Sequence, residues 1–248
     1  MDLKGKVILV TGSSSGIGKA ISIAAAQKGA KILVHFRKNK KGAEDTLKEV
    51  KKYSSGEIYQ ADLSDVSEVK NLFEEFKKES MELDLLVNNA GEAISGELDN
   101  FELWESQWKG IFMSQVYVAN EFLKNAPSKE LRKIVNTGSI YGLFEMGDPD
   151  FPQYSAAKAS VHSFTLNLAK KVAPKVLVNA VAPGWVWTPP WEGTSEVDKE
   201  KLTSLTQINR FIKPEEIAKM VISILENDAV VGEIIRVDGG LHLPKLLI

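Results

Sequence analysis

The 248-residue chain contains no cysteine. Disulfides, thiolate nucleophiles and cysteine-based zinc sites are therefore excluded. Histidine is also scarce, since only His35, His162 and His242 occur and they lie far apart in the sequence. We therefore expect no metal site.

Long hydrophobic runs are absent as well. The N-terminal segment has one short apolar run, Val7 to Val10, whereas a secretory signal needs about 7–15 apolar residues and a membrane span about 20. The 31 basic and 33 acidic residues give a net charge of -2, so nothing draws the whole chain to nucleic acid or to an anionic membrane. These absences predict a cytoplasmic protein with neither kind of partner.

What the chain does have is a regular alternation of short apolar runs with longer helical patterns. Nearly continuous apolar runs are typical of strands buried on both faces, and their alternation with helices predicts one parallel sheet with right-handed crossovers. We predict a single α/β domain over residues 1–248, with residues 184–210 as an aperiodic substrate loop or lid. The expected strands are Val7–Thr11, Lys31–Phe36, Glu57–Ala61, Leu83–Val87, Lys133–Thr137, Val176–Ala182 and Glu233–Val237. Helical patterns include Ile17–Lys28, Lys40–Lys52, Ser64–Lys78, Phe101–Asn125, Gln153–Val172 and Pro214–Glu226.

A glycine-rich turn joins the first strand to the first helix. Glycines occupy positions 12, 16 and 18 of the segment Thr11-Gly-Ser-Ser-Ser-Gly-Ile-Gly18. Glycine permits positive φ and lets a pyrophosphate approach the backbone, and the helix N-terminus offers free N–H groups. By itself this turn is either a phosphate-binding site or only a tight connection.

Further short motifs follow in a fixed order. They are Asn88-Asn-Ala-Gly91 after the fourth strand, Ser139 after the fifth, Tyr154-Ser-Ala-Ala-Lys158, Pro183-Gly184 after the sixth, and Val237-Asp-Gly-Gly240 at the seventh. With the glycine-rich turn, this set resembles the short-chain dehydrogenase/reductase superfamily from residue 6 to about 240.

The resemblance implies a Rossmann-like, doubly wound sheet of about seven strands in the order 3-2-1-4-5-6-7, with helices on both faces and NAD or NADP at the switch point. The positions that match the family's cofactor-binding residues are Gly12, Ser14, Ser15, Gly16, Ile17, Gly18, Arg37, Asp62, Leu63, Asn89, Ala90, Gly91, Tyr154, Lys158, Pro183, Gly184, Val186 and Thr188.

The same resemblance makes Ser139, Tyr154 and Lys158 the catalytic group. Tyr154 and Lys158 are four residues apart on one predicted helix face. A free tyrosine has a pKa of about 10, and we expect Lys158, together with the positive oxidised nicotinamide, to lower it by favouring the phenolate. Ser139 is expected to hold a substrate oxygen beside the tyrosine hydroxyl.

One family position is altered. Gln107 stands where relatives carry a catalytic asparagine that helps to hold a water in the proton relay, so it is included among the catalytic candidates. The longer amide is either an adaptation that shifts this water or a neutral replacement. Because of it, two functions stay open: an oxidoreductase, or a nucleotide-binding sensor or interaction protein with weak or no turnover.

The end of the second strand bears on the choice of cofactor. Relatives that prefer NAD carry an aspartate there, whereas this chain has Phe36 followed by Arg37 and Lys38. A 2′-phosphate would therefore meet basic groups, which favours NADP(H), with NAD(H) still possible. The alternative is a basic cluster that is only solvated.

The expected substrate is a small carbonyl or alcohol compound. Two aromatic segments are candidates for the walls of its pocket. Large apolar side chains in a cleft favour an apolar or ring-bearing substrate, although these tryptophans could instead pack on the protein or on a partner. We also expect a homotetramer or homodimer formed through Phe101–Asn125 and Gln153–Val172, as in many relatives. The candidate walls are Trp185, Trp187 and Trp191 on one side, and Tyr141, Phe144, Met146 and Phe151 on the other.

Overall fold

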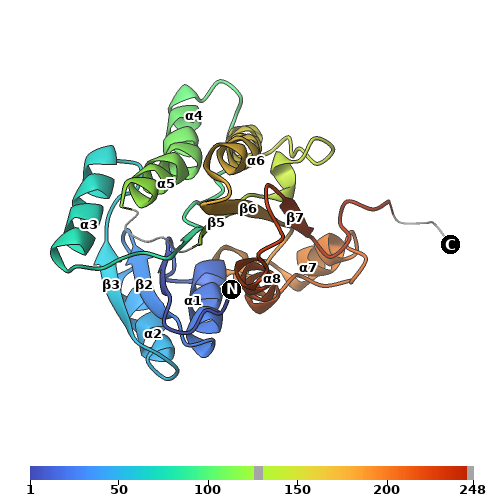
Figure 1. Ribbon diagram of the computed structural model, residues 1–248. Helices are drawn as coiled ribbons and strands as arrows, with labels where there is room; N and C mark the ends of the chain where they lie inside the picture. Colours follow the sequence, from blue (N-terminus) through green and yellow to red (C-terminus); the bar gives the residue numbers. More distant parts are fainter. Residues whose placement is uncertain (126–130, 245–248) are drawn as a thin grey trace.

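A computed structural model describes residues 1–125 and 131–244 of the chain. Its centre is a seven-stranded parallel sheet (Figure 1). The strands are β1 Val7–Val10, β2 Lys31–Phe36, β3 Gly56–Gln60, β4 Leu85–Asn88, β5 Arg132–Thr137, β6 Val176–Pro183 and β7 Ile234–Val237. They lie in the order β3-β2-β1-β4-β5-β6-β7, which confirms the expected topology.

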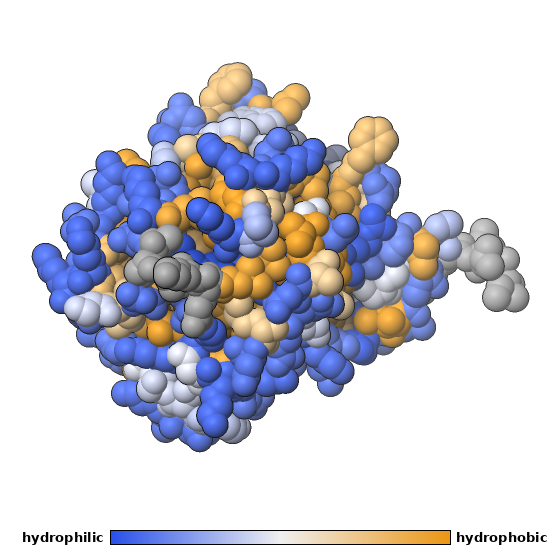
Figure 2. Space-filling model, in the orientation of Figure 1, coloured by the Kyte–Doolittle hydropathy of each residue, from blue (hydrophilic) through white to orange (hydrophobic). Residues whose placement is uncertain are grey.

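Helices cover both faces of the sheet (Figure 1). One apolar cluster joins β1 and β2 to α1, α2 and α8, and a second packs α3, α5 and α6 on the opposite face. Figure 2 shows hydrophilic residues around most of the outline of one face, with apolar residues gathered toward its centre. The helices are α1 Gly16–Gln27, α2 Lys40–Val50, α3 Val66–Lys78, α4 Phe101–Gln107, α5 Ser114–Lys124, α6 Pro152–Val172, α7 Glu196–Thr203 and α8 Pro214–Glu226.

The helical patterns differ from the observed helices in two informative places. The segment expected as one helix over Phe101–Asn125 is α4 and α5, joined by a π-helical stretch, η1, over Trp108–Met113. Helix α3 begins at Val66 rather than at Ser64, because the Asp65 side chain accepts a hydrogen bond from Ser67 N and caps the helix. Side-chain capping, rather than apolar periodicity, determines this boundary.

The segment 184–210 is more ordered than its composition indicates. It contains the short 3₁₀ turn η3 at Pro189–Trp191 and helix α7. Ser195 caps α7 by accepting from Asp198 N, at 3.1 Å. No residue of α7 is buried, so this helix has no apolar stripe from which periodicity could predict it.

Among the described residues, no helix is long and apolar enough to cross a membrane. Over the same two ranges, no three histidine, aspartate or glutamate side chains lie together as metal ligands.

A buried lysine anchors the carboxyl end of α8 to the sheet. Lys133 on β5 is 1% exposed, and its Nζ donates to the carbonyl oxygens of Leu225 and Asn227 at 2.8 and 2.9 Å. The same ammonium lies 2.7 Å from Asp228 Oδ1. Carbonyl groups at a helix C-terminus have no intrahelical donors, and a positive charge there opposes the negative end of the helix dipole.

We predict that Lys133→Met lowers the free energy of unfolding by about 2–3 kcal/mol, because charge-assisted hydrogen bonds to buried carbonyls are lost. Lys28→Met is the matched control at the same helix end, since Lys28 pairs with Glu226 at 2.7 Å but is about half exposed. Lys28→Met should lower the free energy of unfolding by less than about 1 kcal/mol. Urea denaturation of both variants measures the difference, and equal losses would contradict this account.

Candidate active site

A pocket of about 500 Å³ lies at the carboxyl ends of β1 to β4. This edge of an open parallel sheet is where ligands bind, next to the point at which the strand order reverses. The pocket brings together residues that are up to about 100 positions apart in sequence. The predicted site residues that line it are Gly12, Ser14, Ser15, Arg37, Asp62, Leu63, Asn89, Ala90, Gly91 and Gln107.

The glycine-rich turn is packed too closely for side chains. Gly12 has φ +62°, and a Cβ on it would lie 2.8 Å from the Cα of Ala90. A Cβ on Gly18 would lie 2.5 Å from the carbonyl oxygen of Gly12. The turn therefore requires glycine both for its backbone conformation and for its contact with the segment after β4. This close backbone cradle fits a dinucleotide pyrophosphate.

Two polar side chains hold this turn against the segment after β4. The backbone N–H groups of Asn89 and Ala90 donate to Thr11 Oγ1 at 2.8 and 3.0 Å. The Asn89 amide donates in return to the carbonyl oxygens of Thr11 and Gly12 at 3.0 and 3.2 Å. Asn89 thus joins two sequence motifs, the glycine turn and Asn88-Asn-Ala-Gly91, into one structural unit.

Arg37 and Asp62 face each other across the pocket. Arg37 Nη1 lies 4.0 Å from Asp62 Oδ2, and the Arg37 side chain is 49% exposed. Asp62 Oδ1 accepts from the backbone N and the Oγ of Ser64. These hydrogen bonds and the charge of Arg37 hold the pKa of Asp62 below its usual value although burial opposes them. Arg37 is therefore an accessible cation at the end of β2.

The remaining predicted cofactor-binding residues lie around the glycine-rich turn and the end of β6. A Cβ on Gly16 would be 3.1 Å from Thr188 Cγ2, which places Thr188 beside the glycine turn. Ile17 and Val186 pack into the apolar cluster beneath that turn. Pro183 is buried at the end of β6, and Gly184 donates from its N–H to the carbonyl oxygen of Val237.

The three predicted catalytic residues Ser139, Tyr154 and Lys158 meet at the end of β5. Lys158 Nζ donates to the carbonyl oxygen of Thr137 at 2.7 Å and lies 5.6 Å from the centre of the Tyr154 ring. Ser139 hydrogen-bonds to the Tyr154 hydroxyl. A Cβ on Gly91 would lie 3.9 Å from Lys158 Nζ, so this group is next to the cofactor-pocket wall.

Burial changes the acidity of both α6 side chains. It raises the pKa of Tyr154, and the hydrogen bond with Ser139 opposes the rise. Desolvation lowers the pKa of Lys158 to about 7. The expectation that Lys158 and the positive oxidised nicotinamide together lower the pKa of Tyr154 stays a prediction.

His162 also contacts the segment that carries Ser139, and it was not among the residues predicted from the sequence. It lies one turn beyond Lys158 on α6, where its Nδ1 contacts the Gly142 carbonyl oxygen at 3.1 Å and its Nε2 accepts from Ser139 N at 3.4 Å. Burial and the charge of Lys158 lower its pKa to about 4. The uncharged imidazole thus ties the Ser139 turn to α6. Its spacing of four from Lys158 is the signal that could have revealed it.

Gln107 lies at the junction of α4 and η1. It is 4% exposed, and its Oε1 has no hydrogen-bond partner within the described ranges. Single π-helical turns are rare and often occur at functional sites. The amide is therefore placed at the pocket wall with an acceptor oxygen that can hold a water.

The aromatic residues expected as substrate walls divide into two sets. Trp185 Nε1 donates to Tyr141 Oη at 2.8 Å, and the Tyr141 ring lies edge-on to Tyr154 at 6.4 Å. Phe151 stacks on Tyr141. By contrast, Trp187 and Trp191 pack on Phe211 within their own loop, and Phe144 is fully exposed.

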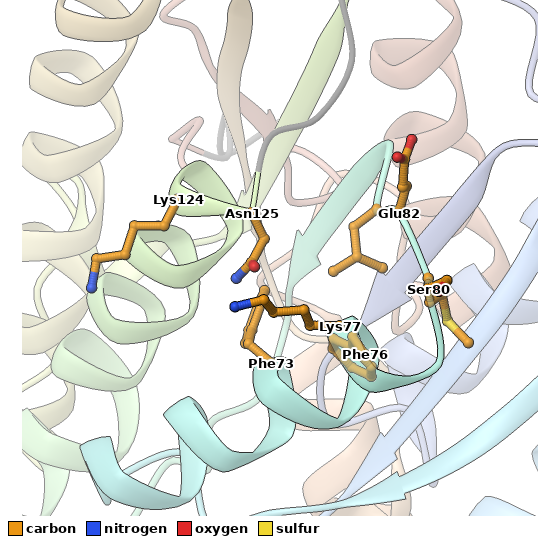
Figure 3. Close-up of a pocket in the computed structure, with 9 residues that line it drawn as sticks. Phe73, Phe76, Lys77, Ser80, Glu82, Lys124 and Asn125 are labelled. Carbon is orange, nitrogen blue, oxygen red and sulfur yellow. The ribbon is translucent and has the colours of Figure 1, made fainter.

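A second cavity, of about 380 Å³, lies away from these residues, between the end of α3 and the end of α5 (Figure 3). The ends of Lys77 and Asn125 lie close together in this view, above Phe73 and Phe76, whereas the Lys124 side chain extends away from them (Figure 3). None of the predicted cofactor or catalytic residues lines it.

Comparison with known proteins agrees with this geometry. A family model described as short chain dehydrogenase matches residues 6–199. The chain is 33% identical to the 3-oxoacyl-(acyl-carrier-protein) reductase FabG of Thermotoga maritima, over 97% of this chain and 99% of that protein.

Solved structures agree as well. The RhlG/NADP active-site complex of Pseudomonas aeruginosa superposes with a TM-score of 0.89 at 28% identity, covering 98% of each chain. The L-sorbose reductase of Gluconobacter frateurii, complexed with NADPH and L-sorbose, gives 0.90 at 26% identity, covering 99% of this chain and all of that one. The chain belongs to the short-chain dehydrogenase/reductase superfamily and is an NAD(P)-dependent oxidoreductase of that class.

The desolvation of Lys158 predicts a pH-dependent cost in stability. Its pKa falls from 10.5 in the unfolded chain to about 7 in the folded protein. The cost is therefore complete below pH 7, where both states are charged, and disappears as the pH rises toward 10.5. Lys158→Met should melt at a higher temperature than the wild type at pH 6, by a margin that shrinks at pH 9.

Lys109→Met is the control for that measurement, because Lys109 is mostly exposed and pairs with Glu105. Its melting temperature should differ from that of the wild type by the same small amount at both pH values. A melting-temperature difference between Lys158→Met and the wild type that is the same at pH 6 and pH 9 would contradict the lowered pKa of Lys158.

Proposed function

We propose that this protein binds NADP(H) and interconverts a carbonyl compound and an alcohol, with Tyr154 as the general acid and base. The observation that carries the proposal is the convergence of Ser139, Tyr154 and Lys158 at the end of β5, beside the wall of the pocket that the glycine turn closes. A bound nicotinamide would supply the hydride in reduction and accept it in oxidation.

The chain's own residues account for the proton. In reduction, the Tyr154 hydroxyl gives its proton to the carbonyl oxygen while the Ser139 hydroxyl hydrogen-bonds to that oxygen, and the carbonyl carbon receives the hydride. Lys158 stabilises the resulting phenolate by its charge. Gln107, with its unpartnered Oε1, holds the water that returns a proton to this group.

Two features favour NADP(H) over NAD(H). β2 ends at Phe36 without a carboxylate, and Arg37, Lys38 and Asn39 line the pocket beyond it. The RhlG and L-sorbose reductase structures are complexes with NADP and NADPH, which supports the same choice. NAD(H) stays possible because the glycine turn would serve both nucleotides.

The substrate proposal rests on fewer aromatic residues than the sequence offers as candidates. Tyr141, Phe151 and Trp185 form the aromatic wall nearest to Tyr154, so we propose an apolar or ring-bearing carbonyl compound. The related proteins act on quite different molecules by their names, an acyl-carrier-protein thioester and L-sorbose, and so support the reaction class but not one substrate.

The same proposal includes a homodimer or homotetramer formed through α4, α5 and α6. An aromatic row crosses from η1 to α6: Trp108 lies 4.7 Å from Phe112, and Phe112 lies 6.1 Å from Phe164. Trp108 and Leu166 are each about two-fifths exposed. Closed symmetric association would bury this surface.

The alternative is a nucleotide-binding sensor with weak or no turnover, which the unusual Gln107 favours. NADPH oxidation measured against a panel of ketones, acyl thioesters and sugars separates the two. NADPH binding without turnover on any of them would favour the sensor.

For the enzyme, Tyr154→Phe should lower kcat by at least about 100-fold, because the proton donor is lost. NADPH affinity, measured by fluorescence, should change little, since the ring stays in place. Turnover close to that of the wild type would refute the role of Tyr154.

For the cofactor, Arg37→Ala should raise the NADPH dissociation constant by about 10-fold or more, the low end for a lost charge-assisted bond. NADH affinity should barely change, because NADH lacks the 2′-phosphate. The NADPH effect should shrink at high salt, since the exposed charge is screened. Equal losses for both nucleotides would favour NAD instead.

A further inference from the structure

His35 is a buried imidazole to which the proposed reaction gives no role. It lies on β2, two residues before Arg37, and is 2% exposed. We propose that His35 is a positioning residue for cofactor binding, whose uncharged ring holds the Gly12 peptide in the orientation that the glycine-rich turn needs. The inference rests on the proposed NADP(H) site and adds a determinant of affinity for it.

Both ring nitrogens of His35 are engaged, each with a different loop. The Gly12 N–H donates to His35 Nδ1 at 3.0 Å. His35 Nε2 lies 3.0 Å from the carbonyl oxygen of Ala61, at the end of β3. Because Nδ1 accepts from a backbone N–H, it carries no proton, so Nε2 carries the proton and donates it to Ala61. The contacts therefore define one neutral tautomer.

The neighbouring residue of the turn is clamped to the same position. Ser13 N donates to the His35 carbonyl oxygen at 2.9 Å, and His35 N donates to Ser13 Oγ at 3.0 Å. Ser13 Oγ donates in turn to the Val10 carbonyl oxygen at 2.7 Å. The backbone of residue 35 thus fixes Ser13 whatever its side chain is, while the ring alone fixes Gly12.

Gly12 is consequently held from both sides. Its N–H is bound by His35, and its carbonyl oxygen is bound by the Asn89 amide at 3.2 Å. A glycine at φ +62° has access to a wide range of backbone conformations. Without a partner for its N–H, the peptide before Gly12 can rotate, and the turn then loses the arrangement that receives the pyrophosphate.

The uncharged state of the ring agrees with this role. Burial lowers the pKa of His35 to about 4, although the Ala61 carbonyl and the charge of Asp62 oppose the change. A protonated ring would direct an N–H at the N–H of Gly12, which is repulsive. A buried neutral histidine is therefore suited to accept from this peptide.

Two substitutions separate the two nitrogens. In His35→Asn, Oδ1 takes the place of Nδ1 and can still accept from Gly12, but nothing reaches Ala61. In His35→Gln, Nε2 of the amide takes the place of the ring Nε2 and can still donate to Ala61, but the Gly12 N–H is left without its acceptor. Each variant loses one hydrogen bond of the same length.

We expect His35→Asn to bind NADPH within about twofold of the wild type, and His35→Gln to bind it about 5- to 10-fold more weakly, by fluorescence titration. In each variant, NADH affinity should fall by the same factor as NADPH affinity, because the turn serves both nucleotides. Arg37→Ala should instead change the ratio of the two affinities. If His35→Asn and His35→Gln bind NADPH equally well, or if either one changes the ratio of NADPH affinity to NADH affinity, the role of His35 is overturned while the cofactor assignment stands. Failure of the wild type to bind either nucleotide would overturn the cofactor assignment with it.

A measurement on the unaltered protein keeps the proposal falsifiable if either variant fails to fold. Only three histidines are present, so ¹⁵N-histidine labelling can resolve their tautomers by NMR. The proposal requires a neutral ring with the proton on Nε2 for His35 at pH 7. A charged ring, or a proton on Nδ1, would overturn it.

Discussion

The contact of a buried ammonium with one strand-end carbonyl is the interaction on which the site depends. Lys158 Nζ is held at 2.7 Å by Thr137 O, and this contact fixes α6 against the end of β5. Tyr154 is one helical turn earlier on α6, and Ser139 is two residues after Thr137. The Lys158–Thr137 bond therefore sets the distance between the two hydroxyl groups that would share a substrate oxygen.

This arrangement has a cost in stability that the rest of the fold offsets. Lys158 is desolvated without a carboxylate partner among the described residues, and burial also raises the pKa of Tyr154. Functional sites commonly retain such unfavourable burial because the chemistry requires it. Elsewhere, buried cations have more partners. Lys133 caps α8, and Arg132 stacks on Phe122 at 3.7 Å while its Nε and Nη2 donate to main-chain oxygens, although its Nη1 has no partner among the described residues.

The cofactor side is organised by neutral groups rather than by charge. Asn89 and His35, from two different segments, bind the backbone of the glycine-rich turn, and Thr11 of the turn accepts from the backbone N–H groups of Asn89 and Ala90. Arg37, the accessible cation, stands at the rim and is paired only loosely with Asp62. In the proposed function, the neutral groups around the turn would support binding of either nucleotide, and Arg37 would distinguish between them.

Much of this could be predicted from the sequence, and the reason is local. Strands buried on both faces must be apolar, and Gly12 must be glycine because its φ is positive and Ala90 is 2.8 Å from its Cβ position. Ordered motifs of this kind predicted the sheet order and the family, both confirmed. The grouping of Ser139, Tyr154 and Lys158 was expected from the resemblance to the family, and the structure places them together at the end of β5.

Other features were decided only by tertiary structure. Helix α7 buries nothing, and the π-helical stretch after Gln107 has no periodic pattern, so neither was predicted. His35 resembled any strand residue, yet its ring contacts Gly12 and Ala61, which lie 23 and 26 positions away in the sequence. Trp187 and Trp191 each pack against Phe211, a contact that their spacing in the sequence does not reveal. A sequence specifies what each residue can donate, accept or bury, whereas the partner that it meets depends on how distant segments pack.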